Sequence, residues 1–288
     1  MLEKPAKSQS FYQNARRKCM NTKKLLPFVV VLTLAATGFG QVRQNTHVSD
    51  TVSINATTAC QFTFTSGGGG PNFLKFCVTV NGNVVQLMSP GGFEHIREGT
   101  VLEGYSICDF GSLTRYYDFA AADSGNWQAP VISGVTLPLT IKRSTSDGIY
   151  TLTQVFNRNT VEPAVTITMT LKNNTVASHN FALVRYADID ANNANGGTFN
   201  NWFDFDHQSA WGYNNGFNLF GLMLYSVPTK TGHFGFVQDT ADFPDSCNPV
   251  AHLPSSTPWF GDGSAGLDWN GTLGASAAVT VTGEYRRF

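Results

Sequence analysis

Apolar and polar residues alternate along much of the chain after residue 50. From Val165 to Leu171, apolar side chains stand at every second position and threonines stand between them. A period of two is that of a β-strand with one buried face. No stretch of comparable length has the 3.6-residue period of an amphipathic helix, so we predict an all-β chain. Similar runs predict further strands at 60–65, 73–80, 84–88, 113–119, 137–143, 149–156, 181–187, 217–225, 233–237 and 277–285.

Turn-forming residues separate these runs and indicate antiparallel pairing. The Asn-Gly dipeptide at 81–82 suits the positive φ angles of a type I′ hairpin. Residues 173–175 turn the chain between the strands at 165–171 and 181–187, which with 149–156 are predicted to form a β-meander. Short turns of this kind are typical of antiparallel sheets.

Two stretches interrupt the strand pattern. Residues 123–130 are predicted to be an exposed loop that carries Trp127. Residues 238–270 contain four prolines and are predicted to be a long, loop-rich section before the last strand.

The first forty residues have the features of a secretory signal peptide. Basic residues precede an apolar run at 25–36, and small residues follow it before a cut at residue 41. The run is shorter than the about 20 residues of a spanning helix, although a retained membrane anchor is the alternative. Met20 could be the true start, and residues 41–50 are predicted to be a flexible lead-in. We therefore expect a protein that is secreted, periplasmic or displayed on the cell surface.

Composition and charge agree with an exported β-rich protein. Hydrophobic residues make up 42% of the chain and charged residues only 14%, against roughly 25% in an average soluble domain. Without residues 1–40 the chain keeps 12 of its 19 basic and 19 of its 20 acidic residues, a net charge of −7. An acidic mature chain argues against nucleic acid or an anionic membrane as the partner.

Four cysteines follow the predicted leader, namely Cys60, Cys77, Cys108 and Cys247. An even number in an exported chain indicates up to two disulfides. Four cysteines allow three connectivities; we favour Cys60 or Cys77 with Cys108, with Cys247 tying back a late loop. Buried free thiols are the alternative.

The length of 288 residues suffices for one large domain or two modest ones. We predict one large antiparallel two-sheet β-sandwich over residues 51–288. Two smaller sandwiches, at about 51–135 and 136–288, are the alternative.

The strand pattern at 147–154, 165–173 and 181–190 resembles the galactose-mutarotase-like supersandwich modules of carbohydrate-active proteins. The resemblance implies the two-sheet fold. It carries over no site residues, because no motif matches position by position.

Oxygen-bearing side chains are densest between residues 185 and 213. Asp188, Asp190 and Asn192 alternate there as the ligands of a calcium loop do, and we take them as candidate metal ligands. The Gly and Glu that an EF-hand requires at positions six and twelve are absent, so a β-type Ca²⁺ loop is the prediction. An Asx-turn loop that caps its own backbone is the alternative.

Candidate catalytic groups lie in the same region. Asp204 and Asp206 would share a face of a strand, next to His207, and paired carboxylates can divide acid and base roles. An exposed polar edge is the alternative. His95, between Glu94 and Glu98, is a second acid–base candidate, with a solvated loop as its alternative.

Tryptophans beside polar loops suggest a sugar ligand. Trp127, Trp202 and Trp211, with Arg185, are the candidate ligand-binding residues. Sugar rings stack apolar faces on aromatic planes while their hydroxyls bind charged and amide groups. The leading hypothesis is a non-catalytic protein that binds carbohydrate or cell-envelope polysaccharide. A secreted glycosidase, lyase or epimerase and a structural envelope protein are the alternatives.

Overall fold

Strands occupy most of the described chain. The computed structural model describes residues 56–96, 102–191, 199–204, 209–214, 221–226, 233–239, 244–248, 259–260 and 263–287. The predicted leader and lead-in lie outside these ranges. The chain divides into two units, 1–49 and 50–288, and every described residue belongs to the second. The described residues contain strands and no helix, which confirms the all-β prediction, and so they include no helix able to cross a membrane.

The largest sheet among the described residues has nine strands, and every pair of adjacent strands in it is antiparallel. In spatial order it contains β15 (Trp259–Phe260), β11 (Phe199–Asp204), β12 (Ser209–Asn214), β13 (Gly221–Ser226), β17 (Ala278–Arg287), β9 (Ala164–Asn173), β8 (Tyr150–Arg158), β7 (Leu139–Ser144) and β6 (Val131–Ser133).

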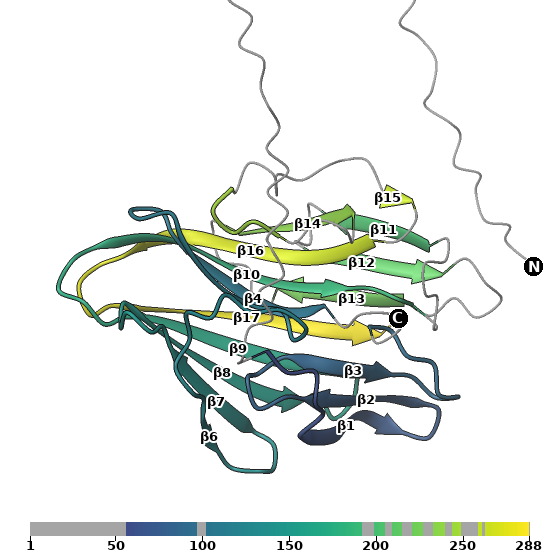
Figure 1. Cartoon of the computed structure of the whole chain (residues 1–288). Coiled ribbons are helices and arrows are strands. Elements are labelled where there is room, and N and C mark those ends of the chain that lie inside the picture. The colour runs from purple at the N-terminus through teal and green to yellow at the C-terminus, as the bar shows by residue number, and fades with distance from the viewer. Residues whose placement is uncertain are drawn as a thin grey trace, which may run out of the picture. The chain divides into compact units, whose positions relative to one another are not determined.

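Two smaller antiparallel sheets complete the fold. The five-stranded sheet contains, in spatial order, β14 (His233–Asp239), β16 (Gly263–Leu273), β10 (His179–Asp188), β4 (Glu103–Asp109) and β5 (Thr114–Asp118). The three-stranded sheet contains β1 (Phe62–Gly69), β2 (Asn72–Val78) and β3 (Val84–Met88). Figure 1 shows β16 and β10 layered over the long strands of the nine-stranded sheet.

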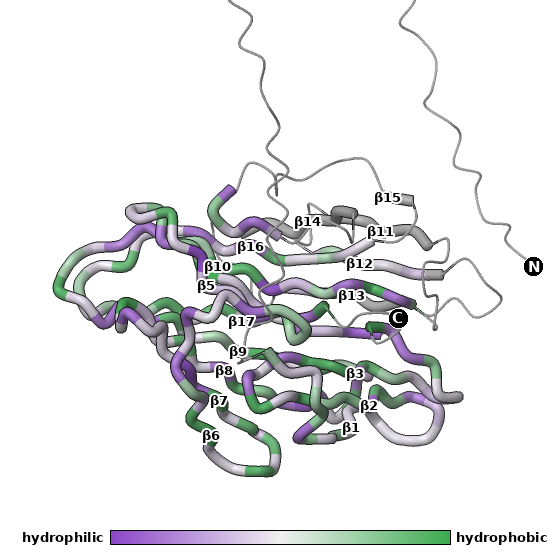
Figure 2. The backbone as a smooth tube through the Cα atoms, in the orientation of Figure 1, coloured by the Kyte–Doolittle hydropathy of each residue, from purple (hydrophilic) through white to green (hydrophobic). Residues whose placement is uncertain are grey.

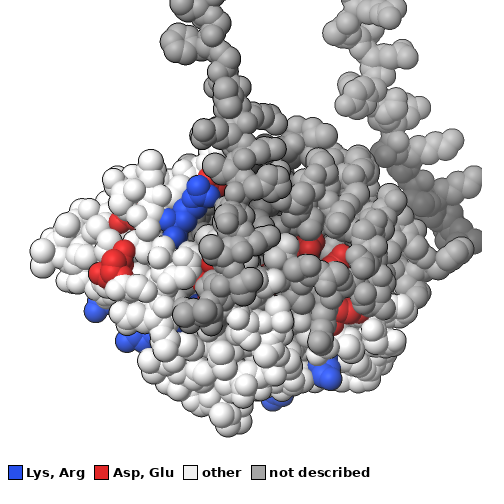
Figure 3. Space-filling model, viewed as in Figure 1, with Lys and Arg blue, Asp and Glu red and all other residues white. Residues whose placement is uncertain are grey.

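One hydrophobic core joins all three sheets. Val165, Ile167, Met169 and Leu171 of β9 are buried in it, while the threonines between them lie on the other face of the sheet. Figure 2 shows hydrophobic and hydrophilic segments alternating along the strands, and Figure 3 shows only scattered charges on the face in view. The predicted sandwich is thus confirmed, with a small third sheet packed against it.

The predicted β-meander is wrong at its third strand. β8 and β9 pair as expected, but β10 leaves for the five-stranded sheet, where it lies between β4 and β16. The last eight residues of β10, Phe181–Asp188, are buried on both faces, as a central strand of an inner layer must be.

Strands also replace parts of the predicted loops. Residues 263–273, within and beyond the expected loop-rich section, form β16, which lies between β14 and β10 in the five-stranded sheet. Residues 199–204 and 209–214 form the strand pair β11 and β12, neither of which is among the predicted strands. Both segments contain Gly, Asn and Asp, which are uncommon in strands, so the sequence did not indicate strands there. Contacts with the neighbouring strands stabilise the extended conformation instead.

The turn between β2 and β3 lies in the interior. Gly82 has a φ of +91°, and a Cβ at this position would lie 2.2 Å from Nε2 of Gln154. Asn81 and Asn83 beside it are buried. The predicted hairpin is therefore present, but its turn is not of type I′, because only Gly82 of the Asn-Gly pair has a positive φ. The tip faces the core and requires glycine at 82 both for its conformation and for its close approach.

Arg185 meets this buried turn. Its guanidinium is fully buried, forms an ion pair with Glu103 and donates hydrogen bonds to the Gly82 carbonyl (3.3 Å) and to Oε1 of Gln154 (2.7 Å). Tyr285 donates a 2.6 Å hydrogen bond to Glu103. Burial raises the pKa of the Glu103 carboxyl, while Arg185 acts in the opposite direction. This polar cluster links β10, β4 and β17 inside the sandwich.

A second buried ion pair joins Arg143 of β7 to Asp118 of β5. Burial raises the pKa of Asp118 to about 6, against the lowering effect of Arg143. The guanidinium of Arg143 also lies 5.1 Å from the ring centre of Trp127, which is only 3% exposed. Trp127 donates a 3.1 Å hydrogen bond to the Tyr117 carbonyl, so the predicted exposed tryptophan is a core residue.

Both predicted disulfides are present, but with another connectivity. Cys60 pairs with Cys77, which lies on the neighbouring strand β2, and Cys108 pairs with Cys247. The favoured pairing of Cys60 or Cys77 with Cys108 is wrong because Cys108 lies on β4, in a different sheet from β2.

Residues 244–248 are fastened to the five-stranded sheet at three points. Besides the Cys108–Cys247 disulfide, Ser246 shares a 2.7 Å hydrogen bond with Ser106, and Asp245 forms a 3.3 Å salt bridge with Arg115. Cys247 therefore does tie a late segment back, as predicted.

Candidate binding surface on the nine-stranded sheet

The outer face of the nine-stranded sheet can be traced from strand to strand. On β17, Val281 and Tyr285 belong to the core, so Glu284 and Arg286 lie on the opposite face. On β12 and β13 the core residues are Ala210 and Leu224, which puts Trp211 and Tyr225 on that same outer face.

The register aligns these residues in two adjacent rows. Glu284 pairs with Tyr225, which pairs with Ser209, which pairs with Asp204. In the next row Arg286 pairs with Met223, Met223 with Trp211, and Trp211 with Trp202. Directly opposed residues lie about 4.5–5.5 Å apart. We call Trp211, Tyr213, Tyr225, Glu284 and Arg286 the outer-face cluster.

Aromatic and charged groups of this cluster are partly open to solvent. Trp211, Tyr213 and Tyr225 are half-buried. Both Nε (2.9 Å) and Nη2 (2.6 Å) of Arg286 donate to Oε1 of Glu284, and Thr166 donates to Oε2 at 3.1 Å. The side chain of Arg286 is 39% exposed, against 7% for Glu284. The guanidinium of Arg286, fixed by Glu284, can bind the hydroxyls of a ligand. The partly exposed rings beside it can pack against an apolar face of the same ligand.

Threonines continue the outer face away from the aromatic residues. Thr168 shares a 3.2 Å hydrogen bond with Thr282, and Thr170 shares one of 2.9 Å with Thr280. These pairs lie across the β9–β17 ladder. The face is thus polar and regular at one end and aromatic at the other.

The candidate catalytic residues fall partly within the described chain. Asp204 occupies a position in the same row as Glu284, whereas Asp206 and His207 lie outside the described residues. His95 is buried rather than solvated, is bonded to Ser89 through Nε2, and has a pKa lowered to about 4, chiefly by burial. Its neutral, covered ring does not fit the role of an accessible acid–base group.

Two of the four candidate ligand-binding residues are inaccessible. Arg185 and Trp127 are buried and bound to protein groups, so a ligand at the surface does not reach either. The register brings the other two, Trp202 and Trp211, directly opposite each other.

Tyr225, Glu284 and Arg286 were not among the predicted site residues. The alternation along 277–285 indicated which residues share a face, but only the pairing of β17 with β13 joins them to Trp211.

The candidate metal ligands are only partly described. Asp188 and Asp190 are buried, and their backbone N–H groups donate to the carbonyls of Leu102 and His95, both at 2.8 Å. Asn192 lies outside the described residues. Within the described part of the chain, no group of three or more His, Cys, Asp or Glu residues is arranged to hold a metal ion.

The calcium loop remains a prediction, and thermal unfolding tests it. If Ca²⁺ binds through Asp188 and Asp190 in the native state alone, the melting temperature in excess Ca²⁺ is expected to exceed that in EDTA by several degrees. The same shift should vanish in Asp190→Asn. Equal melting temperatures in Ca²⁺ and in EDTA would exclude the site.

Comparison with known proteins gives a fold but no family. No protein-family model matches the sequence, and no curated protein matches it. A bacterial glucoamylase, solved in complex with acarbose, superposes with a TM-score of 0.57 at 9% identity over 81% of this chain. A putative aldose 1-epimerase from Escherichia coli K12 superposes with a TM-score of 0.50 at 10% identity over 79%.

These two structures define the class of the fold. The match covers 98% of the epimerase but only 32% of the glucoamylase, so this chain spans about a third of the latter. Both proteins are carbohydrate-active by name. The described chain shares the β-sandwich fold of these two proteins, in keeping with the resemblance that its strand pattern predicted, and identities of 9–10% establish the fold alone.

Proposed function

We propose that this protein is an exported, non-catalytic carbohydrate-binding protein whose outer-face cluster contacts the sugar. The observation that carries the proposal is the alignment of Trp211, Tyr225, Glu284 and Arg286 in adjacent rows of the outer sheet face. Trp211 and Tyr225, in neighbouring rows, suit the C–H faces of sugar rings, and the Arg286–Glu284 pair offers both donors and acceptors to hydroxyls.

Export is part of the same proposal. It is supported by the leader-like residues 1–40 and by two disulfides, which persist in oxidising compartments. A periplasmic or cell-surface location would put the sandwich in contact with envelope or environmental polysaccharides.

Replacing Trp211 by alanine is expected to abolish retention on immobilised glycans, because the ring supplies the largest apolar contact of the cluster. The measurement is binding of residues 41–288 to a glycan array, followed by titration of the best hit. Removing one stacked aromatic side chain is expected to weaken binding by about tenfold or more.

The matched control is Lys172→Ala, a change on β9 of the same sheet but at its far end. This variant should bind as the unmodified protein does, and both variants should keep their melting temperature. Unchanged retention by a folded Trp211→Ala protein would refute the role of the cluster.

Catalysis is the second candidate function, because Asp204 and Glu284 occupy one row of the sheet. An enzyme would release or rearrange sugar from a bound polysaccharide, and Asp204→Asn would remove that turnover while leaving retention. Retention without product supports the binding protein. Neither retention nor turnover across a broad panel would favour a structural role in the envelope.

A further inference from the structure

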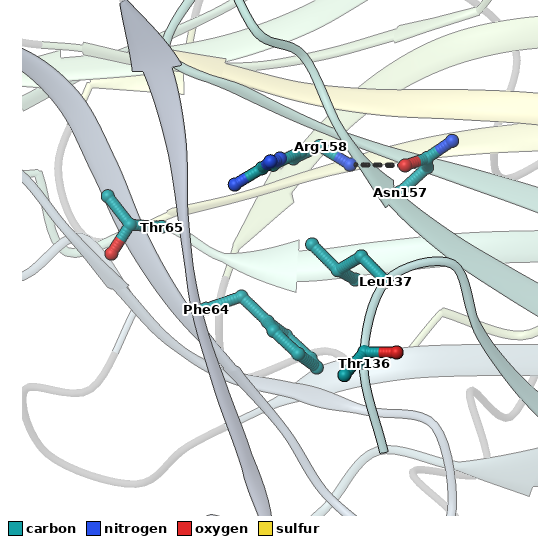
Figure 4. A pocket seen from close by; sticks show the side chains of 6 residues that line it. All are labelled: Phe64, Thr65, Thr136, Leu137, Asn157 and Arg158. Carbon is teal, nitrogen blue, oxygen red and sulfur yellow. Dashed lines mark hydrogen bonds between the residues drawn. The ribbon is translucent and has the colours of Figure 1, made fainter. Parts of the chain in front are cut away.

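A pocket lies where the three-stranded sheet meets one end of the nine-stranded sheet, away from the outer-face cluster. It has a volume of about 290 Å³ and is lined by Phe64 and Thr65 of β1, Thr136 and Leu137 of the β6–β7 connection, and Asn157 and Arg158 of β8. Figure 4 shows Phe64 beside Leu137, with Arg158 reaching across above them toward β1. The size suits one sugar residue, since pockets for larger ligands run from about 300 to 1,000 Å³.

The two walls of this pocket differ in character. Phe64 and Leu137 are half-buried and pack against the core, which fixes an apolar surface. The ring of Phe64 lies 5.4 Å from that of Phe76, so its orientation is supported from behind. Thr136 and Asn157 add polar side chains to the lining, whereas Figure 4 shows the side chain of Thr65 on the side of β1 opposite Phe64.

The charge of the pocket is positive. None of its six lining residues is acidic, and Arg158 forms no ion pair among the described residues. An exposed, unpaired guanidinium is suited to a carboxylate, which it can bind through two parallel hydrogen bonds.

We propose that this pocket binds a carboxylated sugar residue, a uronate. The carboxylate would pair with Arg158, the C–H face of the ring would lie on Phe64, and the hydroxyls would bind Asn157 and Thr136. The inference deepens the proposed function by naming an acidic saccharide as one ligand class, and it uses residues separate from the outer-face cluster.

Titration with trigalacturonate, with the uncharged galactotriose as comparison, tests the pocket. The unmodified protein is expected to bind trigalacturonate more tightly, and the preference should fall as salt is raised. Arg158→Gln is expected to weaken trigalacturonate binding by about ten- to a hundredfold, because it removes a charge-assisted contact. Lys172→Gln removes a cation from β9 outside the pocket and should change nothing.

The outcomes separate the pocket from the proposed function. Equal trigalacturonate affinity in Arg158→Gln and the unmodified protein, or no trigalacturonate binding at all, overturns the pocket. If the pocket is overturned but neutral glycans are still retained through Trp211, the proposed function holds without the pocket.

If trigalacturonate binds through Arg158 while Trp211→Ala has no effect on any glycan, the pocket is supported and the role of the outer-face cluster is refuted. Competition by inorganic phosphate as strong as by trigalacturonate would show a general anion site and would overturn the sugar assignment.

Discussion

Replacing Arg185 by methionine is expected to lower the free energy of unfolding by about 3–5 kcal/mol, because it leaves the carboxylate of Glu103 buried without its counter-charge. The change also removes the hydrogen bonds from Arg185 to Gly82 and Gln154, which hold the buried β2–β3 turn. Denaturant unfolding of the oxidised protein measures the loss, with an unchanged slope indicating the same denatured state.

The loss should also depend on pH. Burial already raises the pKa of Glu103 in the folded protein, and removing Arg185 removes an interaction that lowers it. Folded Glu103 then holds a proton above the pH at which the unfolded chain has released it, so the stability of the variant falls as pH rises. The difference in the free energy of unfolding between Arg185→Met and the unmodified protein is therefore expected to be larger at pH 7 than at pH 5.

Arg115→Met provides the control for this substitution. Arg115 forms its 3.3 Å salt bridge with Asp245 at the surface, and its side chain is 45% exposed. Exposed pairs contribute about 0–1 kcal/mol. A loss below about 1 kcal/mol for Arg185→Met, comparable with that of Arg115→Met, would contradict the role assigned to the buried pair.

Removing the Cys108–Cys247 disulfide with two alanines is expected to cost about 4–5 kcal/mol. This disulfide closes a loop of 139 residues, and the entropy it withholds from the unfolded chain grows with loop length. The Cys60–Cys77 disulfide joins residues only 17 positions apart. Replacing both of its cysteines by alanine is therefore expected to lower the free energy of unfolding by only about 3 kcal/mol. Thermal and denaturant unfolding of the two double variants gives the comparison.

A larger loss from the Cys60–Cys77 variant would contradict the loop-length argument. Segment 244–248 offers a further check, because its salt bridge and serine–serine hydrogen bond depend on the tether. Limited proteolysis is expected to cut near this segment in the Cys108–Cys247 variant and not in the Cys60–Cys77 variant.

Sequence periodicity identified many of the strands but did not identify their partners. The alternation in β9 identified both its faces, because one face is core and the other is threonine. It could not assign β10 to a different sheet, since strand order depends on contacts between distant segments. Polar strands such as β16 lacked the signal altogether: Asp268 and Ser264 are buried there, although such residues usually lie at the surface.

The candidate site was predicted in part for the same reason. Trp202 and Trp211 were chosen because they lie close in sequence, and the β11–β12 hairpin keeps them adjacent. Glu284 and Arg286 join them from a strand more than 70 residues further along the chain, which no local pattern reveals. Arg185 was predicted to bind a ligand because a charged residue in a polar stretch suggests exposure. It is instead buried with Glu103, which lies on a strand 82 positions earlier in the chain.

The positions of β16 and β17 bear on the order of assembly. They are the last described strands in the chain, yet β16 lies between β14 and β10, and β17 lies between β13 and β9. Each large sheet therefore stays divided into two parts until these residues are available, and every closing contact spans a long stretch of chain. Folding of this unit cannot be completed before residues 263–287 have been synthesised. If the chain is exported as proposed, its late closure keeps it suitable for threading through a narrow channel.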